Sequence, residues 1–84
     1  MADIETIDSQ IRVVLGKHAH LSRDVVQIGV DDDLHHAGLT SLSTVNVMLG
    51  LEDAFEIEFP DHMLNKKVFT SIGSIRAAIV ELVA

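Results

Sequence analysis

Apolar residues recur at helical spacing in three separate stretches of this 84-residue sequence. In the first stretch the apolar side chains fall on one narrow arc of a helix; they are Ile4, Ile7, Ile11, Val14 and Leu15. Asp3 is of a residue type that caps a helix start, and Gly16 suits a helix end. A strand would scatter the same side chains over both of its faces. The pattern therefore predicts an all-α fold.

The second stretch, residues 41–55, predicts a helix that is apolar on most of its circumference. One apolar arc consists of Val47, Met48, Leu51, Ala54 and Phe55. A second arc consists of Leu42, Val45 and Leu49, and the polar strip consists of Ser43, Asn46, Gly50 and Asp53. So short a chain has few helices to cover two apolar faces, so we interpret the second arc as a contact surface for a partner protein. Packing of this arc in the core is the alternative.

The segment between the first two helices, residues 17–40, is predicted to be a long loop. Gly29, the acidic run Asp31–Asp33 and Gly38 argue against a continuous helix there. Residues 25–30 are compatible with a short extended piece, but a lone strand has no second strand to pair with. A loop of this length in a compact domain is typical of a functional segment.

The C-terminal part of the chain predicts two further helices. Pro60 ends an extended stretch over 56–59 and opens a short helix over 61–65. The last helix begins near Thr70 or Ser71, either of which is able to cap it. Its apolar side is formed by Ile72, Ile75, Ile79, Leu82 and Val83. The length leaves room for one domain, residues 1–84, with a modest core.

Charge and composition exclude several classes of function. Thirteen acidic and six basic residues give a net charge of −7, which disfavours nucleic acid as a partner, since phosphate neutralisation needs clustered Lys and Arg. A positively charged protein surface suits the chain better, although the acidic residues also serve simply to keep a small domain in solution. The absence of cysteine excludes disulfides and thiolate metal sites. No apolar run suggests a signal peptide or a membrane span, so we expect a cytoplasmic protein without a membrane partner.

Clusters of side chains that resemble metal ligands lack the required spacing. The pairs His18/His20 and His35/His36 are not spaced as two ligands on one helical face, and we interpret them as surface histidines. The run Asp31–Asp33 resembles the start of a calcium loop, but the residues after it supply neither the glycine nor the closing glutamate. We therefore expect no metal site.

Ser41 is the residue best placed for chemistry, because it lies where the long loop meets the second helix. Free backbone N–H groups and the positive end of the helix dipole favour an anion there, such as a phosphate ester on the serine hydroxyl. As a hydrolytic nucleophile, Ser41 would need a base within reach and a substrate pocket, which so short a chain does not readily build. Glu52 and Glu56, four residues apart, are typical of a solvated helix face. We therefore expect that the protein is not an enzyme.

The stretch from Asp33 to Phe69 resembles the acyl carrier proteins. Their hallmark is Gly-Leu followed by Asp-Ser-Leu at the start of the second helix, and residues 38–42 read Gly-Leu-Thr-Ser-Leu. Residues 51–55 and 57–61 resemble the family's Leu-Glu-Glu-x-Phe and Ile-Pro-Asp patterns. The resemblance implies a small four-helix bundle with three longer helices, one short helix and a long loop between the first two.

The same resemblance implies a prosthetic group. It makes Ser41 the single site at which a phosphopantetheinyl transferase attaches 4′-phosphopantetheine. The thiol of that arm then carries a thioester-bound substrate from a loading enzyme to a downstream transferase. A carrier of this kind is expected to be a monomer.

Departures from the family pattern point to particular partners. Thr40 stands where the usual Asp precedes the serine, and Ser43 and Asn46 stand where fatty-acid carriers offer acids to basic enzymes. These departures resemble the small stand-alone aminoacyl carrier proteins of bacteria, which receive an amino acid such as glycine from ligases that resemble class II aminoacyl-tRNA synthetases. We expect the partner surface to consist of Thr40, Leu42, Val45 and Leu49. An acyl carrier for fatty-acid or polyketide synthesis and a cofactor-free interaction module are the alternatives.

Overall fold

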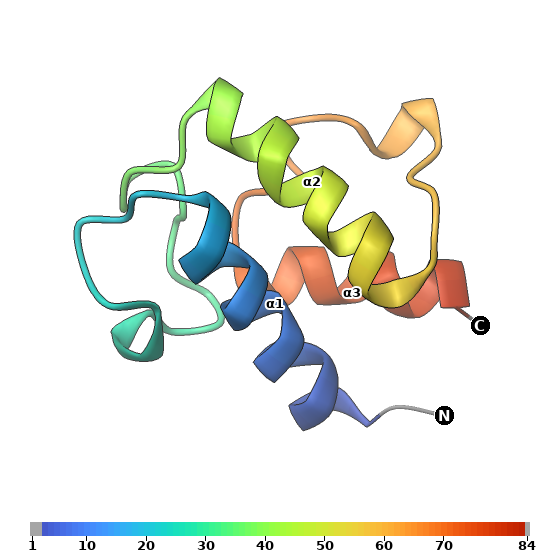
Figure 1. Ribbon diagram of the computed structural model, residues 1–84, viewed down its shortest axis with the longest axis horizontal. Coiled ribbons are helices and arrows are strands. Elements are labelled where there is room, and N and C mark those ends of the chain that lie inside the picture. The colour runs from blue at the N-terminus through green and yellow to red at the C-terminus, as the bar shows by residue number, and fades with distance from the viewer. Residues whose placement is uncertain (1–2, 84) are drawn as a thin grey trace.

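The computed structural model describes residues 3–83 and shows a helical bundle (Figure 1). Its helices are α1 (Ile4–His18), α2 (Ser41–Phe55) and α3 (Ile72–Val83), with single 3-10 turns η1 (Val25–Gln27) and η2 (Asp61–Met63). Residues 3–83 contain no strand, so the all-α prediction is confirmed, as are both ends of the second helix. No helix in this part of the chain is both long and apolar enough to span a membrane.

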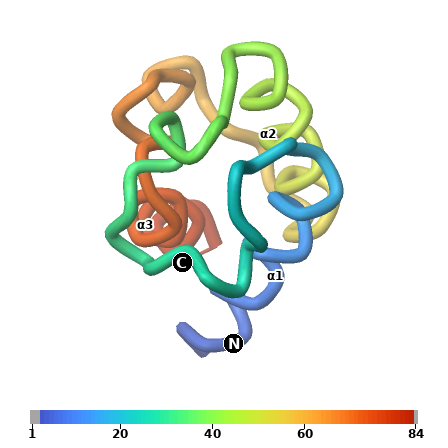
Figure 2. The backbone as a smooth tube through the Cα atoms, turned by 90° about the vertical axis from the view of Figure 1, so that its left-hand side faces the viewer, coloured from blue at the N-terminus to red at the C-terminus, as the bar shows by residue number. Residues whose placement is uncertain are grey.

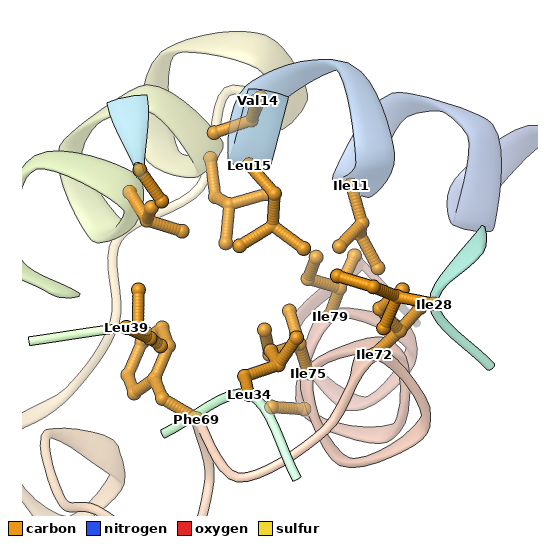
Figure 3. Packing of buried hydrophobic residues seen from close by; sticks show 14 of the residues in the cluster. Ile11, Val14, Leu15, Ile28, Leu34, Leu39, Phe69, Ile72, Ile75 and Ile79 are labelled. Atoms are coloured by element: carbon orange, nitrogen blue, oxygen red, sulfur yellow. The ribbon is translucent and has the colours of Figure 1, made fainter. Parts of the chain in front are cut away.

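Helix α1 is the centre of the bundle, since α2 and α3 both pack against it. The core side chains come from the three helices and from the loops between them (Figure 3). The largest fully buried side chains are Ile11, Leu15, Ile28, Leu34, Val47, Leu51, Phe69, Ile72, Ile75 and Ile79. Burial of one such side chain stabilises the fold by about 1.5–3 kcal/mol relative to leaving it exposed. The loops are therefore part of the core and hold the helices in place.

The ends of the helices differ from the sequence prediction. Ile4 and Val83 are 56% and 48% exposed, because they lie at the free ends of α1 and α3, near the chain termini (Figure 1). Ala54 is exposed on the last turn of α2. Helix α1 continues past the predicted end at Gly16 to His18, where a basic last turn suits the negative end of the helix dipole.

The long loop between α1 and α2 is ordered by its own apolar side chains and by Arg12. Ile28 and Leu34 are almost completely buried. Arg12 Nη1 donates to the carbonyl oxygens of Val25 and Ile28 at 2.6 and 2.7 Å. The extended piece considered for 25–30 is wrong in part, because Val25–Gln27 form η1. Figure 2 shows the loop running from the end of α1 past α3 to the start of α2.

The segment after α2 is fixed by a side chain that the sequence placed in solvent. Glu52 Oε2 accepts a hydrogen bond from the N–H of Phe59 at 2.9 Å, so the prediction that Glu52 is simply solvated is wrong. The ring centroid of Phe59 lies 5.6 Å from that of Phe69. The helix predicted over 61–65 is only the turn η2, since Leu64 leaves the helical conformation with φ −87° and ψ 69°.

Predicted residues cap α1 and α3. Asp3 accepts from the N–H of Thr6 at 2.8 Å, and Ser71 Oγ accepts from the N–H of Ser74 at 3.1 Å. The hydrogen bond from the Thr6 N–H holds the pKa of Asp3 below its usual range. The contribution of this cap to stability is therefore complete above the unfolded-state pKa and is lost as the pH falls through the lowered folded-state pKa.

Gly50 lies against α1 and not on an exposed polar strip as predicted. A Cβ at Gly50 would lie 2.9 Å from Val14 Cγ1 and 2.9 Å from His18 Cδ2. The His18 ring is exposed and can move, but Val14 is buried and branched. The absence of a side chain at Gly50 therefore lets α2 approach α1 closely.

We expect Gly50→Ala to lower the free energy of unfolding by about 1 kcal/mol, because an overpacking cost of ~1–3 kcal/mol exceeds the ~1 kcal/mol gained in helix propensity. Gly16→Ala is the matched control, since a Cβ there lies 3.7 Å from Val25 Cγ1, an ordinary contact. The control should raise the free energy of unfolding by roughly 0.5–1 kcal/mol. Chemical denaturation measures both, and stabilisation by Gly50→Ala would contradict the close helix contact.

Candidate functional site

Ser41 is the first residue of α2, and a reciprocal pair of hydrogen bonds fixes where this helix begins. The N–H of Ser43 donates to Thr40 Oγ1 at 3.1 Å, and the N–H of Thr40 donates to Ser43 Oγ at 2.9 Å. This capping box uses the side chains of Thr40 and Ser43 and leaves the side chain of Ser41 exposed. The serine hydroxyl is therefore presented to solvent at a rigid helix start.

The turn that leads into α2 depends on Gly38. Its φ of 119° is a conformation that L side chains rarely adopt, and a Cβ there would lie 3.0 Å from the carbonyl oxygen of His20. The next residue, Leu39, is buried, and its N–H donates to the carbonyl oxygen of Leu34 at 2.9 Å. The Gly-Leu pair thus fixes the backbone just before Ser41.

A groove of about 540 Å³ opens beside Ser41. Helix α2 forms one wall with Ser41, Val45 and Met48. The segment between η2 and α3, which passes beside α2 in Figure 1, forms the other wall with Leu64, Lys66 and Phe69. The groove is therefore mostly apolar, and the exposed Ser41 is part of its lining.

No carboxylate lines this groove among the described residues, although the chain has thirteen acidic residues. Lys66 is the basic residue in the lining, and Asn65 and His35 add polar groups. An anion attached to Ser41 would lie at a helix N-terminus and near a cation, not among like charges. The site therefore fits a phosphate ester on the Ser41 oxygen.

A family model described as the phosphopantetheine attachment site matches residues 9–79. The chain belongs to this family of carrier proteins. A protein of this family bears phosphopantetheine, carries substrate for partner enzymes and is not itself catalytic. The resemblance on which the expectation of a carrier rested is therefore confirmed.

The carrier protein is also similar to individual proteins. It is 44% identical to the aminoacyl carrier protein of Agrobacterium fabrum over 73 residues. These residues make up 87% of this chain and 88% of the relative. It also matches a chain in the crystal structure of engineered Bradyrhizobium japonicum glycine:[carrier protein] ligase complexed with carrier protein from Agrobacterium tumefaciens and ATP. This match has a TM-score of 0.88 and 42% identity, and it covers 90% of this chain and 99% of that chain. A match to the structure of the Bradyrhizobium japonicum ligase complexed with glycylated carrier protein has TM-score 0.72 and 26% identity over 86% of this chain and 96% of that chain.

The second apolar face of α2 is exposed in the carrier protein. Leu42, Val45 and Leu49 are 74%, 49% and 53% exposed, so the alternative that they pack in the core is wrong. Leu64, on the other wall of the groove, is 44% exposed. Exposed apolar side chains on both sides of Ser41 are typical of a protein contact surface.

The acidic run of the carrier protein has a structural role in the loop before α2. Asp32 Oδ2 accepts from the N–H of Gly29 at 2.8 Å and from Arg23 Nη2 at 3.2 Å. The hydrogen bond from the Gly29 N–H holds the pKa of Asp32 below its usual range. Asp33 Oδ1 accepts from the N–H of His35 at 2.9 Å. Within residues 3–83, no group of three or more His, Asp or Glu side chains is arranged to hold a metal ion.

His35 is a candidate functional residue that the sequence did not reveal. It lines the groove, and its ring nitrogens lie 3.3 Å from the carbonyl oxygens of Leu39 and Lys66. His35 is partly buried by these contacts, whereas His36 is exposed at the surface as expected. No local pattern distinguishes the two, because the contact of His35 with the carbonyl oxygen of Lys66 depends on tertiary structure.

We expect Thr40→Asp to preserve both the fold and the modification of Ser41, because Asp is a good N-cap and its charge suits the helix N-terminus. Thr40→Ala should instead lower the free energy of unfolding by about 1 kcal/mol, since it removes the cap. Chemical denaturation measures the stability, and intact mass after coexpression with a transferase measures the modification. Equal stability of Thr40→Asp and Thr40→Ala would contradict the role of Thr40 in the capping box.

Proposed function

We propose that this carrier protein holds an amino acid as a thioester on a 4′-phosphopantetheine arm attached to Ser41. The observation that carries the proposal is the exposed Ser41 side chain at the first residue of α2, beside a groove without carboxylates. The first-turn N–H groups and the helix dipole stabilise the phosphodiester there. When bound, the arm supplies a thiol that carries the cargo.

Attachment of the arm requires another protein. The Ser41 oxygen must attack the phosphorus that bears pantetheine in coenzyme A, form a new P–O bond and lose its proton as the nucleotide leaves. Within residues 3–83, no hydrogen bond joins the Ser41 hydroxyl to a base; the nearby His35 ring faces the carbonyl oxygens of Leu39 and Lys66 instead. We therefore propose that a phosphopantetheinyl transferase supplies the base and the coenzyme A site.

An amino-acid cargo is favoured over a fatty-acyl cargo. The Agrobacterium fabrum relative is an aminoacyl carrier protein, and the matched structures contain glycine:[carrier protein] ligases. Helix α2 also presents neutral Ser43 and Asn46 near Ser41, where acids would attract basic enzymes of fatty-acid synthesis. We propose a ligase of this kind as the loading partner, glycine as the cargo and a downstream transferase as the acceptor.

Two steps of intact mass spectrometry test the proposal. Coexpression with a broad-specificity phosphopantetheinyl transferase should add the mass of one phosphopantetheinyl group. Incubation of the purified holo-protein with a glycine:[carrier protein] ligase, ATP and glycine should then add one glycyl group, which hydroxylamine removes because it is a thioester. A wild-type protein that stays unmodified would favour a cofactor-free interaction module. A holo-protein that accepts acyl groups from acyltransferases and no amino acid would favour an acyl carrier.

A further inference from the structure

One side-chain hydrogen bond joins the loop before Ser41 to the second wall of the groove. Within the second wall the bonds are local, since Thr70 Oγ1 donates to the carbonyl oxygen of Lys66 at 2.8 Å. Directly after this wall, the N–H of Leu34 donates to the carbonyl oxygen of Thr70 at 2.7 Å. Among residues 3–83, His35 is the side chain from the loop before Ser41 that is hydrogen-bonded to this wall.

The His35 ring lies between two backbone carbonyl groups. Its Nδ1 lies 3.3 Å from the oxygen of Leu39, and its Nε2 lies 3.3 Å from the oxygen of Lys66. A neutral imidazole donates to one of these oxygens, and a protonated ring donates to both. The Asp33 carboxylate accepts from the N–H of His35 and so fixes the backbone from which the ring projects. Leu39 directly precedes the cap of α2, so the ring connects that cap to the opposite wall.

We propose that His35 is a positioning residue for loading, an inference that rests on the proposed function of Ser41. By holding the Lys66 carbonyl close to Leu39, the ring keeps residues 64–69 at a fixed separation from α2. The ligase and the arm then meet a preformed groove, and preformed surfaces lose less conformational freedom on binding. Without the ring, Lys66 keeps its bond from Thr70, so the wall loosens while the domain stays folded.

The test compares His35→Ala with His36→Ala in the holo-protein. His36 is the matched control, because it is adjacent and exposed and its ring is hydrogen-bonded to no described residue. We expect His35→Ala to raise the KM of the ligase for the carrier roughly tenfold and to change kcat less than about twofold, since the ring orients the groove without touching the thiol. His36→Ala should behave as wild type. Proton–nitrogen correlation spectra of His35→Ala should change at Leu39 and over residues 64–70.

Two further variants keep the test decisive. His35→Gln retains an amide donor and should bring KM back to within about threefold of wild type. His35→Phe fills the space of the ring without a donor, so it should fold even where His35→Ala does not, and should raise KM as His35→Ala does. Wild-type KM in His35→Phe, or an equal rise in His36→Ala, would overturn the role of His35. Intact mass of the same samples reports the group on Ser41, so an unmodified wild type reveals a failure of the proposed function itself.

Discussion

Replacement of Ser41 by alanine is expected to abolish attachment of 4′-phosphopantetheine completely, and with it all loading of amino acid. The phosphate ester needs the hydroxyl oxygen, which alanine lacks. The fold should be unchanged, because the Ser41 side chain is exposed and takes no part in the capping box that starts α2. After coexpression with a phosphopantetheinyl transferase, intact mass should show the added group on wild type and none on Ser41→Ala, with equal circular dichroism spectra.

Two other serines provide matched controls for this experiment. Ser9 is exposed on α1, and Ser9→Ala should be modified as fully as wild type. Ser43→Ala should also be modified, although its loss from the capping box should lower the free energy of unfolding by about 1 kcal/mol. Peptide mapping that places the group on another serine, or any modification of Ser41→Ala, would contradict the assignment of Ser41.

Local sequence signals were sufficient for α2 and for the position of Ser41. The apolar period over 41–55 and the break in helix pattern at Gly38 each depend on residues close together in the chain, and the structure places both as predicted. The cap at Thr40 was not predicted, although Thr is a common residue at a helix start. The exposure of Leu42 was also predictable, because a helix that is apolar on two sides cannot bury both in so small a domain. Features of this kind need no knowledge of the tertiary packing.

The features that the sequence did not reveal all depend on contacts between distant segments. Gly50 looks like part of a polar strip until α1 is packed against it. Glu52 looks solvated until the chain after α2 turns back and brings the N–H of Phe59 to its carboxylate. His35 is indistinguishable from His36 until residues 64–69 form the second wall of the groove. The local sequence around a residue does not show which distant segment of the chain will pack against it.

Val45→Ala in the holo-protein is expected to raise the KM of the loading ligase roughly five- to thirtyfold, corresponding to a loss of about 1–2 kcal/mol of binding free energy. Val45 lines the groove beside Ser41 and belongs to the exposed apolar face of α2, so truncation removes contact area for the arm and for the partner. Because Val45 is 49% exposed, the variant should keep its fold. Steady-state loading kinetics measure the first effect and circular dichroism the second.

Val80→Ala is the matched control, because it is the same substitution at a valine of similar exposure, 42%, on α3. Val80 does not line the groove. It should leave KM unchanged, and an equal rise would show that the effect is not local to the Ser41 surface.

The salt dependence of loading provides an independent measurement. The lining of the groove has no carboxylate although the chain has a net charge of −7, so added salt should weaken loading only mildly. The contrary result would be a steep salt dependence of loading together with wild-type kinetics in Val45→Ala. Recognition would then depend on the exposed acids at the end of α2, Asp53 and Glu56, and not on the apolar face.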